Sequence, residues 1–259
     1  GNTALDSLTV GSQNVAVGNN ALTANTSAND NTAVGHESLQ TNTTGAQNTG
    51  LGHRALQLNT TGSQNTAVGR QSLQANTTAS NNTAVGYHSL LSNTTGADNV
   101  AVGSGALDAN TTASENTAVG KDALTDNTTG TSNTAVGRMA LGNNTTANGN
   151  TALGTDAMFT STTGADNTSV GHNSMFDNTT GSNNVAVGSY ALDANTTASN
   201  NTALGYNALT ATTTGADNTA VGQNALTANL AHSNTAVGRY AMRANTTGTE
   251  QVAIGKGAL

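Results

Sequence analysis

The chain has 259 residues, of which 2% are aromatic and 8% are charged, and it contains no proline, cysteine or tryptophan. Its length would allow one or two globular domains, but so few large apolar and charged side chains argue against an ordinary globule. The formal net charge is −7 and the seven Lys and Arg residues form no stripe, which argues against nucleic acid as a partner. Without cysteine, the chain can form neither a disulfide scaffold nor a thiolate metal site.

A five-residue phrase returns about every 17 residues along the whole chain. One clear copy is Asn-Thr-Ala-Val-Gly at residues 65–69, and related copies run in frame from Asn14 to Asn218. The frame then slips by one residue to Asn234, and the last copy starts at Gln251. This period is too short for helical-hairpin repeats and suits one coil of a parallel β-solenoid. We therefore predict an all-β fold of about fifteen coils in a single repeat domain, residues 1–259.

Two stretches depart from the repeat. The first coil, residues 1–13, has apolar residues from Leu8 to Val10 in place of the usual polar corner, which is typical of a cap or a junction. Near the other end, residues 229–234 have lost one residue, and we interpret this as a tolerated loop deletion. Both termini fall within a repeat, so we expect the chain to be an excerpt of a longer protein.

Each coil is expected to contain a strand, a glycine turn, a second short strand around Ala-Leu and a polar Asn-Thr-Thr-Gly corner. The alternation in the first strand places Thr66 and Val68 on one face and Ala67 on the other. Invariant glycine marks a positive φ or a close backbone approach, and corner asparagine is typical of turns. The expected core residues are the valine and leucine columns: Val17, Val34, Val68, Val85, Val119, Leu22, Leu39, Leu73, Leu90 and Leu124. The expected turn residues are Gly18, Gly35, Gly69, Gly86, Asn42, Asn59 and Asn76.

A core this thin needs further support. Burying a full Val or Leu contributes only about 1.5–3 kcal/mol, while ordering each backbone residue costs about 1–2 kcal/mol. Stacked Asn and Thr side chains can hydrogen-bond along the axis, and association of several chains can bury another face. With coils about 4.8 Å apart, we expect a rod of roughly 70 Å.

Candidate catalytic or metal-binding residues are few. His36 and His53 share one column and could approach to about 5 Å, but no third ligand is evident, so we favour variable surface positions over a metal site. Asp98, Asp166 and Asp217 share a freely varying column, which indicates a solvated corner rather than paired catalytic carboxylates. We expect no enzyme, no metal and no cofactor. Nor does the sequence show a signal peptide, a membrane-spanning apolar run or a lipidation motif.

Residues 116–130 read Asn-Thr-Ala-Val-Gly-x-x-Ala-Leu-x-x-Asn-Thr-Thr-Gly. This phrase resembles the repeats of YadA-like heads of trimeric autotransporter adhesins and, more closely, those of phage tail-fibre-like proteins, although the adhesin period is about 14 residues. The resemblance covers the whole chain. It implies a left-handed parallel β-roll in a homotrimer, exposed on a cell surface or virion, that presents binding surfaces or spaces them. A host surface, matrix or glycan receptor would be the partner. On this reading the alanine column packs between chains: Ala33, Ala67, Ala84 and Ala118.

Two other classes stay open. An ice-binding solenoid would explain the Thr-rich sequence, although the adjacent Thr60 and Thr61 point to opposite sides of an extended strand. A self-assembling filament subunit, with chains stacking end to end, fits the unprotected rod ends that termini within a repeat suggest. Beyond these two classes, the uniform repeat is also compatible with a passive spacer that holds a terminal binding domain away from a surface.

Overall fold

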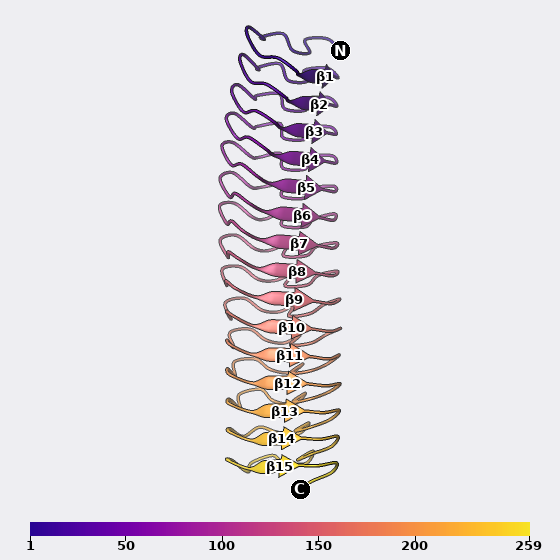
Figure 1. The fold of residues 1–259 in the computed structure, drawn as a ribbon, viewed down its shortest axis with the longest axis vertical. Coiled ribbons are helices and arrows are strands. Elements are labelled where there is room, and N and C mark those ends of the chain that lie inside the picture. Colours follow the sequence, from indigo (N-terminus) through magenta and orange to yellow (C-terminus); the bar gives the residue numbers. More distant parts are fainter. The chain divides into compact units, whose positions relative to one another are not determined.

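The computed structural model describes Gly1–Leu259 and divides into an N-terminal unit, Gly1–Thr131, and a C-terminal unit, Ser132–Leu259. Every strand has three residues, strands within each unit stack in chain order (Figure 1), and the chain contains no helix. The N-terminal unit contains β1 (Val15–Val17), β2 (Thr32–Val34), β3 (Thr49–Leu51), β4 (Thr66–Val68), β5 (Thr83–Val85), β6 (Val100–Val102) and β7 (Thr117–Val119). The C-terminal unit contains β8 (Thr134–Val136), β9 (Thr151–Leu153), β10 (Thr168–Val170), β11 (Val185–Val187), β12 (Thr202–Leu204), β13 (Thr219–Val221), β14 (Thr235–Val237) and β15 (Val252–Ile254).

Strand pairing is parallel and in register, so equivalent residues of successive coils lie side by side. Between β4 and β5, for example, Ala67 pairs with Ala84 and Val68 with Val85. The predicted all-β parallel solenoid and its period of 17 residues are therefore confirmed in both units. The missing residue in 229–234 leaves this ladder intact, because Thr219 still pairs with Thr235.

The first coil lacks a strand but still stacks on the second. Residues 1–13 form turns and bends, and the chain enters the sheet only at Val15. Even so, the Thr9 backbone N–H donates to the Thr26 carbonyl oxygen at 2.9 Å, and the Thr9 hydroxyl donates to the same oxygen at 2.7 Å.

The second strand expected around Ala-Leu does not form, and that prediction is wrong. The leucine of each coil lies in the left-handed region, as Leu73 does with φ 50°, and a residue there turns the chain instead of extending it. The Leu73 N–H nevertheless donates to the Ser89 carbonyl oxygen of the next coil at 2.9 Å. This segment is therefore a stacked turn that points leucine into the coil, where Leu73 is fully buried.

The strand alternates as predicted, but its two faces are reversed. The alanine column, expected between chains, is fully buried inside each coil: Ala33, Ala67, Ala84 and Ala118. The valine column, expected in the core, lies on the outer face with threonine, half-buried at Val34, Val68, Val85 and Val119 and 56% exposed at Val17. The leucine column, namely Leu22, Leu39, Leu73, Leu90 and Leu124, is fully buried.

The tightness of the coil interior explains why alanine lies inside. At Gly50, which replaces alanine in this column, an added methyl group would come within 2.6 Å of the Ser38 hydroxyl and 3.4 Å of Leu39 Cγ. The space between strand and leucine turn therefore accepts only small side chains: glycine, alanine or, at Ser169, serine. A valine pointing inward would overpack it, so the larger side chain of each strand faces outward.

The corner asparagines are buried ladders as well as turn residues. Asn42, Asn59 and Asn76 are fully buried, and the Asn59 side-chain amide donates to Asn42 Oδ1 at 2.8 Å and to the Gly62 carbonyl oxygen at 2.9 Å. A second ladder follows the first residue of each phrase: Asn48 Oδ1 accepts from the backbone N–H of Asn65 at 3.0 Å. The expected side-chain ladders along the stack are thus confirmed, and they satisfy polar groups that would otherwise be costly to bury.

Candidate functional site

The outer face of the strands, which we call the strand face, carries no charged residue. In every strand its two positions hold only Thr, Val, Leu or Ile. The larger side chains are substantially exposed, with Leu51 45%, Leu153 47% and Leu204 47% exposed. The hydroxyls of Thr66 and Thr83 belong to the same face. An uncharged, β-branched face repeated over successive strands is unusual for a surface in contact with water alone.

A second surface, which we call the glycine edge, follows the invariant glycine of each coil. It consists of the positions one, two and five residues after that glycine. All seven Lys and Arg residues and all six Tyr and Phe residues occupy these positions: Arg54, Arg70, Lys121, Arg138, Arg239, Arg243, Lys256, Tyr87, Tyr190, Tyr206, Tyr240, Phe159 and Phe176. The basic residues make no continuous stripe but are confined to this edge. Their spacing from glycine is a signal present in the sequence, although we predicted no functional surface from it.

In the N-terminal unit the glycine edge brings His36 and His53 together as predicted. Their rings stack with centroids 5.4 Å apart and 9° between planes. Arg54 Nε donates to Glu37 Oε2 at 2.7 Å, and this hydrogen bond is the main reason that the pKa of Glu37 is lowered. No third histidine or carboxylate completes a metal-binding group around these residues.

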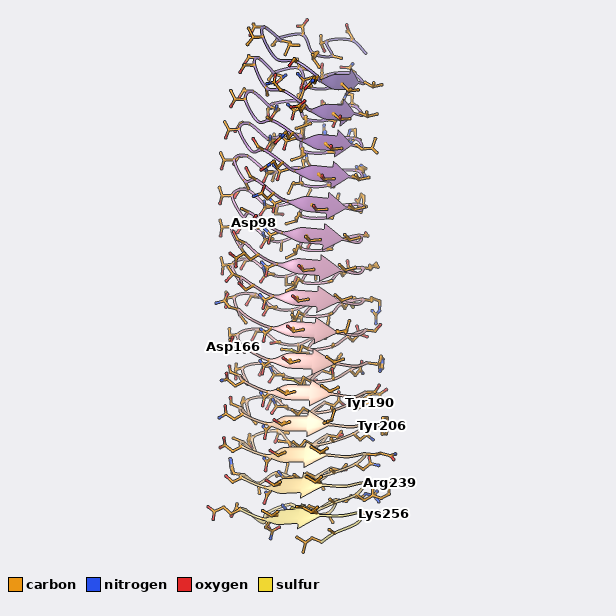
Figure 2. The ribbon with its side chains drawn as sticks, viewed as in Figure 1. Asp98, Asp166, Tyr190, Tyr206, Arg239 and Lys256 are labelled. Atoms are coloured by element: carbon orange, nitrogen blue, oxygen red, sulfur yellow. The ribbon has the colours of Figure 1, made fainter.

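In the C-terminal unit, aromatic and basic residues follow one another along the glycine edge. Figure 2 shows Tyr190, Tyr206, Arg239 and Lys256 on the side toward which the strands point, and Asp166 on the opposite side. The ring of Tyr190 makes edge-to-face contacts with His172 at 5.4 Å and Tyr206 at 6.1 Å between centroids. These rings form an aromatic row along the edge.

The corner opposite the glycine edge carries acidic residues and neither lysine nor arginine. The residue before each phrase is acidic in six coils: Asp30, Asp98, Glu115, Asp166, Asp217 and Glu250. Of these, Asp98 accepts a hydrogen bond from the Asn81 amide at 3.0 Å and has φ 59°. Different residue types share this left-handed position, so the column serves a solvated turn, as the sequence indicated.

Asn-Thr-Thr sequons repeat along the chain, and all but the one at the half-buried Asn245 have their asparagine in the buried corner ladder. Asn42, for instance, is fully buried and its amide donates to the Gly45 carbonyl oxygen at 2.9 Å. Glycosylation requires an accessible amide nitrogen. The folded coil therefore withholds these asparagines from modification.

Burial raises the pKa of the Asp193 carboxyl, and the neighbouring charge of Asp177 raises it further. The folded state therefore binds the proton of the Asp193 carboxyl more tightly than the unfolded state does. The stability that protonated Asp193 contributes is present at low pH and is lost as the pH rises through the pKa of the folded state. We expect Asp193→Asn to raise the melting temperature by about 2 °C at pH 7 and to leave it unchanged at pH 3. Thermal unfolding followed by circular dichroism tests this, with Asp217→Asn on the opposite edge as control. Equal melting temperatures of parent and variant at pH 7 would contradict it.

The strand face and the glycine edge are open surfaces. The chain has no pocket, and none of its elements is a helix that could span a membrane. No protein-family model matches the chain, and no similar protein was found among curated sequences. Fold and surfaces together define the class as a β-solenoid repeat protein, compatible with a structural role, whose two exposed surfaces differ in chemistry.

Proposed function

We propose that this chain is a structural segment of an extracellular fibre in which three copies pack through the strand face. The strand face itself carries this proposal. Each coil completes its own interior with alanine, leucine and asparagine, yet it keeps valine or leucine half-exposed outside. These outer residues are the apolar surface that a partner would cover.

A second copy of the chain is the partner that fits this surface best. The strand face repeats with the period of the coils, so an identical repeating face meets it in register along its length. It has no charge to desolvate, and each outer Val or Leu removed from water contributes about 25 cal/mol per Å² of apolar area. Such association would also bury further apolar surface, which adds to the small stabilisation that the thin core of each coil provides.

The number of chains and the location outside the cell come from the resemblance to trimeric adhesin heads and tail fibres. The strand face on its own requires only self-association. In the assembly, the glycine edge and the polar corners stay exposed, and they would present groups to a host surface, matrix or glycan receptor.

Sedimentation equilibrium tests the proposal directly. We expect a mass near three times the 25.5 kDa of one chain. The double variant Val68→Glu with Val170→Glu places one glutamate on the strand face of each unit. It should shift the protein to single chains, because association would bury each carboxylate against an apolar surface. Combined Leu58→Glu and Leu230→Glu is the matched control, since both leucines are exposed away from the strand face. A parent protein of single-chain mass, or equal masses for both double variants, would contradict the assembly.

The strand face also favours a second candidate, an ice-binding solenoid. Thr66 and Val68 point to the same side and repeat in register on β5, so hydroxyls and methyl groups form a regular array. The objection drawn from adjacent threonines concerned the corner and does not apply to the strand. An ice recrystallisation assay separates the two: inhibition that Thr66→Lys with Thr83→Lys abolishes would support ice binding, and its absence in the parent would exclude it.

A further inference from the structure

We infer that the glycine edge of the last coils binds a saccharide chain that carries carboxylate groups, through Arg239, Tyr240, Arg243 and Lys256. The inference deepens the presenting role proposed above, because it names the ligand class, but it does not depend on the number of chains in the assembly.

Two cations of this cluster lie against one aromatic ring, and a third is on the adjacent coil. The guanidinium of Arg239 lies 4.5 Å from the centroid of the Tyr240 ring, and that of Arg243 lies 5.2 Å from it. Arg239 also donates to the Tyr240 hydroxyl at 2.9 Å. Lys256 occupies the position of Arg239 one coil later. The two coils stack directly at this point, because the backbone N–H of Gly257 donates to the Arg239 carbonyl oxygen at 2.9 Å. The ring thus orients two guanidinium groups, and the next coil adds an ammonium group.

These cations differ from most others in the chain because no carboxylate pairs with them. Elsewhere Arg54 pairs with Glu37, Lys121 with Asp122 and Arg138 with Asp156. Between residues 219 and 259 the single acidic residue is Glu250, which belongs to the opposite corner. Arg239, Arg243 and Lys256 are all exposed. Among the residues of this sequence the three cations have no carboxylate partner, so a local charge of +3 lies on the edge of a chain of net charge −7.

The rest of the glycine edge provides groups that suit sugar rings. Tyr206 is 48% exposed, and it continues the row of rings with Tyr190 (Figure 2). Between Tyr206 and Arg239 the edge carries the amides of Asn207, Gln223 and Asn224. Aromatic faces pack against the apolar side of a sugar, and amides bond to its hydroxyls. Because the coils are spaced about 4.8 Å apart, these groups recur at regular intervals, as the residues of an extended saccharide do.

Charge favours this ligand over other anions. Nucleic acid carries a charge about every 1.7 Å and needs a wider basic surface, and the net negative charge of this chain opposes it. An anionic membrane is typically recognised by clusters of 4–8 Lys or Arg residues. Three cations beside uncharged aromatic and amide groups fit a chain whose carboxylates are spaced between neutral ring surfaces.

Calorimetric titration with a tetrasaccharide of galacturonic acid tests the inference, and its fully methyl-esterified form is the uncharged control ligand. We expect the acid form to bind and the ester to bind at least about tenfold more weakly, since the ester keeps no carboxylate charge for the guanidinium and ammonium groups to pair with. Arg239→Gln with Arg243→Gln should weaken binding of the acid by a similar factor. Arg138→Gln, which removes a paired arginine of the same unit, should leave the affinity unchanged. Both arginines of the double variant are exposed, so its thermal unfolding should match that of the parent.

Several outcomes would overturn the inference: no binding at millimolar tetrasaccharide, equal binding of acid and ester, or an unchanged affinity in the double variant. Tighter binding of single-stranded DNA or of phosphatidylserine vesicles, lost in the same double variant, would also overturn it in favour of a nonspecific cationic patch. Sedimentation of the same samples keeps the two proposals apart. A single-chain protein that binds the acid rejects the fibre assembly alone, while a trimer that does not bind rejects the saccharide alone.

Discussion

Gly69→Ala is expected to lower the free energy of unfolding of the N-terminal unit by roughly 3–5 kcal/mol, beyond the usual range for one substitution. Gly69 has φ 134°, a conformation that side chains rarely adopt. An added Cβ would lie 2.7 Å from the Gly86 carbonyl carbon and closer still to its oxygen. That peptide cannot move away easily, because the Gly86 N–H donates to the Val68 carbonyl oxygen at 2.8 Å. Either the strand ladder or the stacking of the glycine turns must give way.

Gly105→Ala is the matched control, and urea unfolding of both variants makes the comparison. Gly105 also has a positive φ, 69°, but it lies in a column where His88 and Asp122 adopt the same conformation with full side chains. A Cβ at Gly105 would meet only the flexible carboxylate of Asp122. We therefore expect a cost of about 1–2 kcal/mol there. Equal stability of the two variants would show that the glycine column is not required by backbone contact.

Asn59→Ala is expected to destabilise the same unit by roughly 2–4 kcal/mol, because it interrupts a buried hydrogen-bonded ladder. The Asn59 amide donates to Asn42 Oδ1 and to the Gly62 carbonyl oxygen, and Asn59 Oδ1 accepts from the Asn76 amide at 2.8 Å. Without the Asn59 side chain, the buried amide and carbonyl groups that bond to it lose their partner, and water cannot reach them to replace it. Thermal and urea unfolding would measure the loss.

The chain supplies its own control for this substitution. Thr212 occupies the corner position of Asn59 in another coil, is fully buried, and donates from its hydroxyl to the Asn229 carbonyl oxygen at 2.9 Å. Asn59→Thr should therefore cost less than Asn59→Ala, since a hydroxyl keeps one hydrogen bond along the stack. If alanine and threonine were equally destabilising, the contribution of the ladder would lie in the shape of asparagine and not in its hydrogen bonds.

Much of the fold could be predicted because a parallel ladder repeats its physical requirements once per coil. The period of 17 residues indicated the coil length, and the alternation of Thr66, Ala67 and Val68 indicated the strand. A column that is always leucine or methionine marked the buried side chain opposite that strand. The columns of asparagine predicted side-chain ladders, because an amide side chain both donates and accepts and can therefore hydrogen-bond to its copy in the next coil.

The surfaces were harder to predict. The concentration of aromatic and basic residues on the glycine edge follows from their spacing after glycine, and counting by column would have found it. The pairing of those charges could not be read from the columns. Arg138 is neutralised by Asp156 while Arg239 lies over a tyrosine ring, and this depends on which side chains share an edge on adjacent coils.

The sequence by itself determined the parallel stack, its register and the identity of the leucine and asparagine columns, because each is a repeated local requirement. Only the tertiary structure decided which face of the strand is buried. Alternation separates Ala67 from Val68 without saying which points inward, and that choice depends on the space left by the leucine turn. Since Leu73 curls back in a left-handed conformation, the interior accepts alanine and leaves valine outside. Because leucine turns the chain there, the expected second strand does not form. Because valine points outward, the strands carry the uncharged strand face on which the proposed assembly depends.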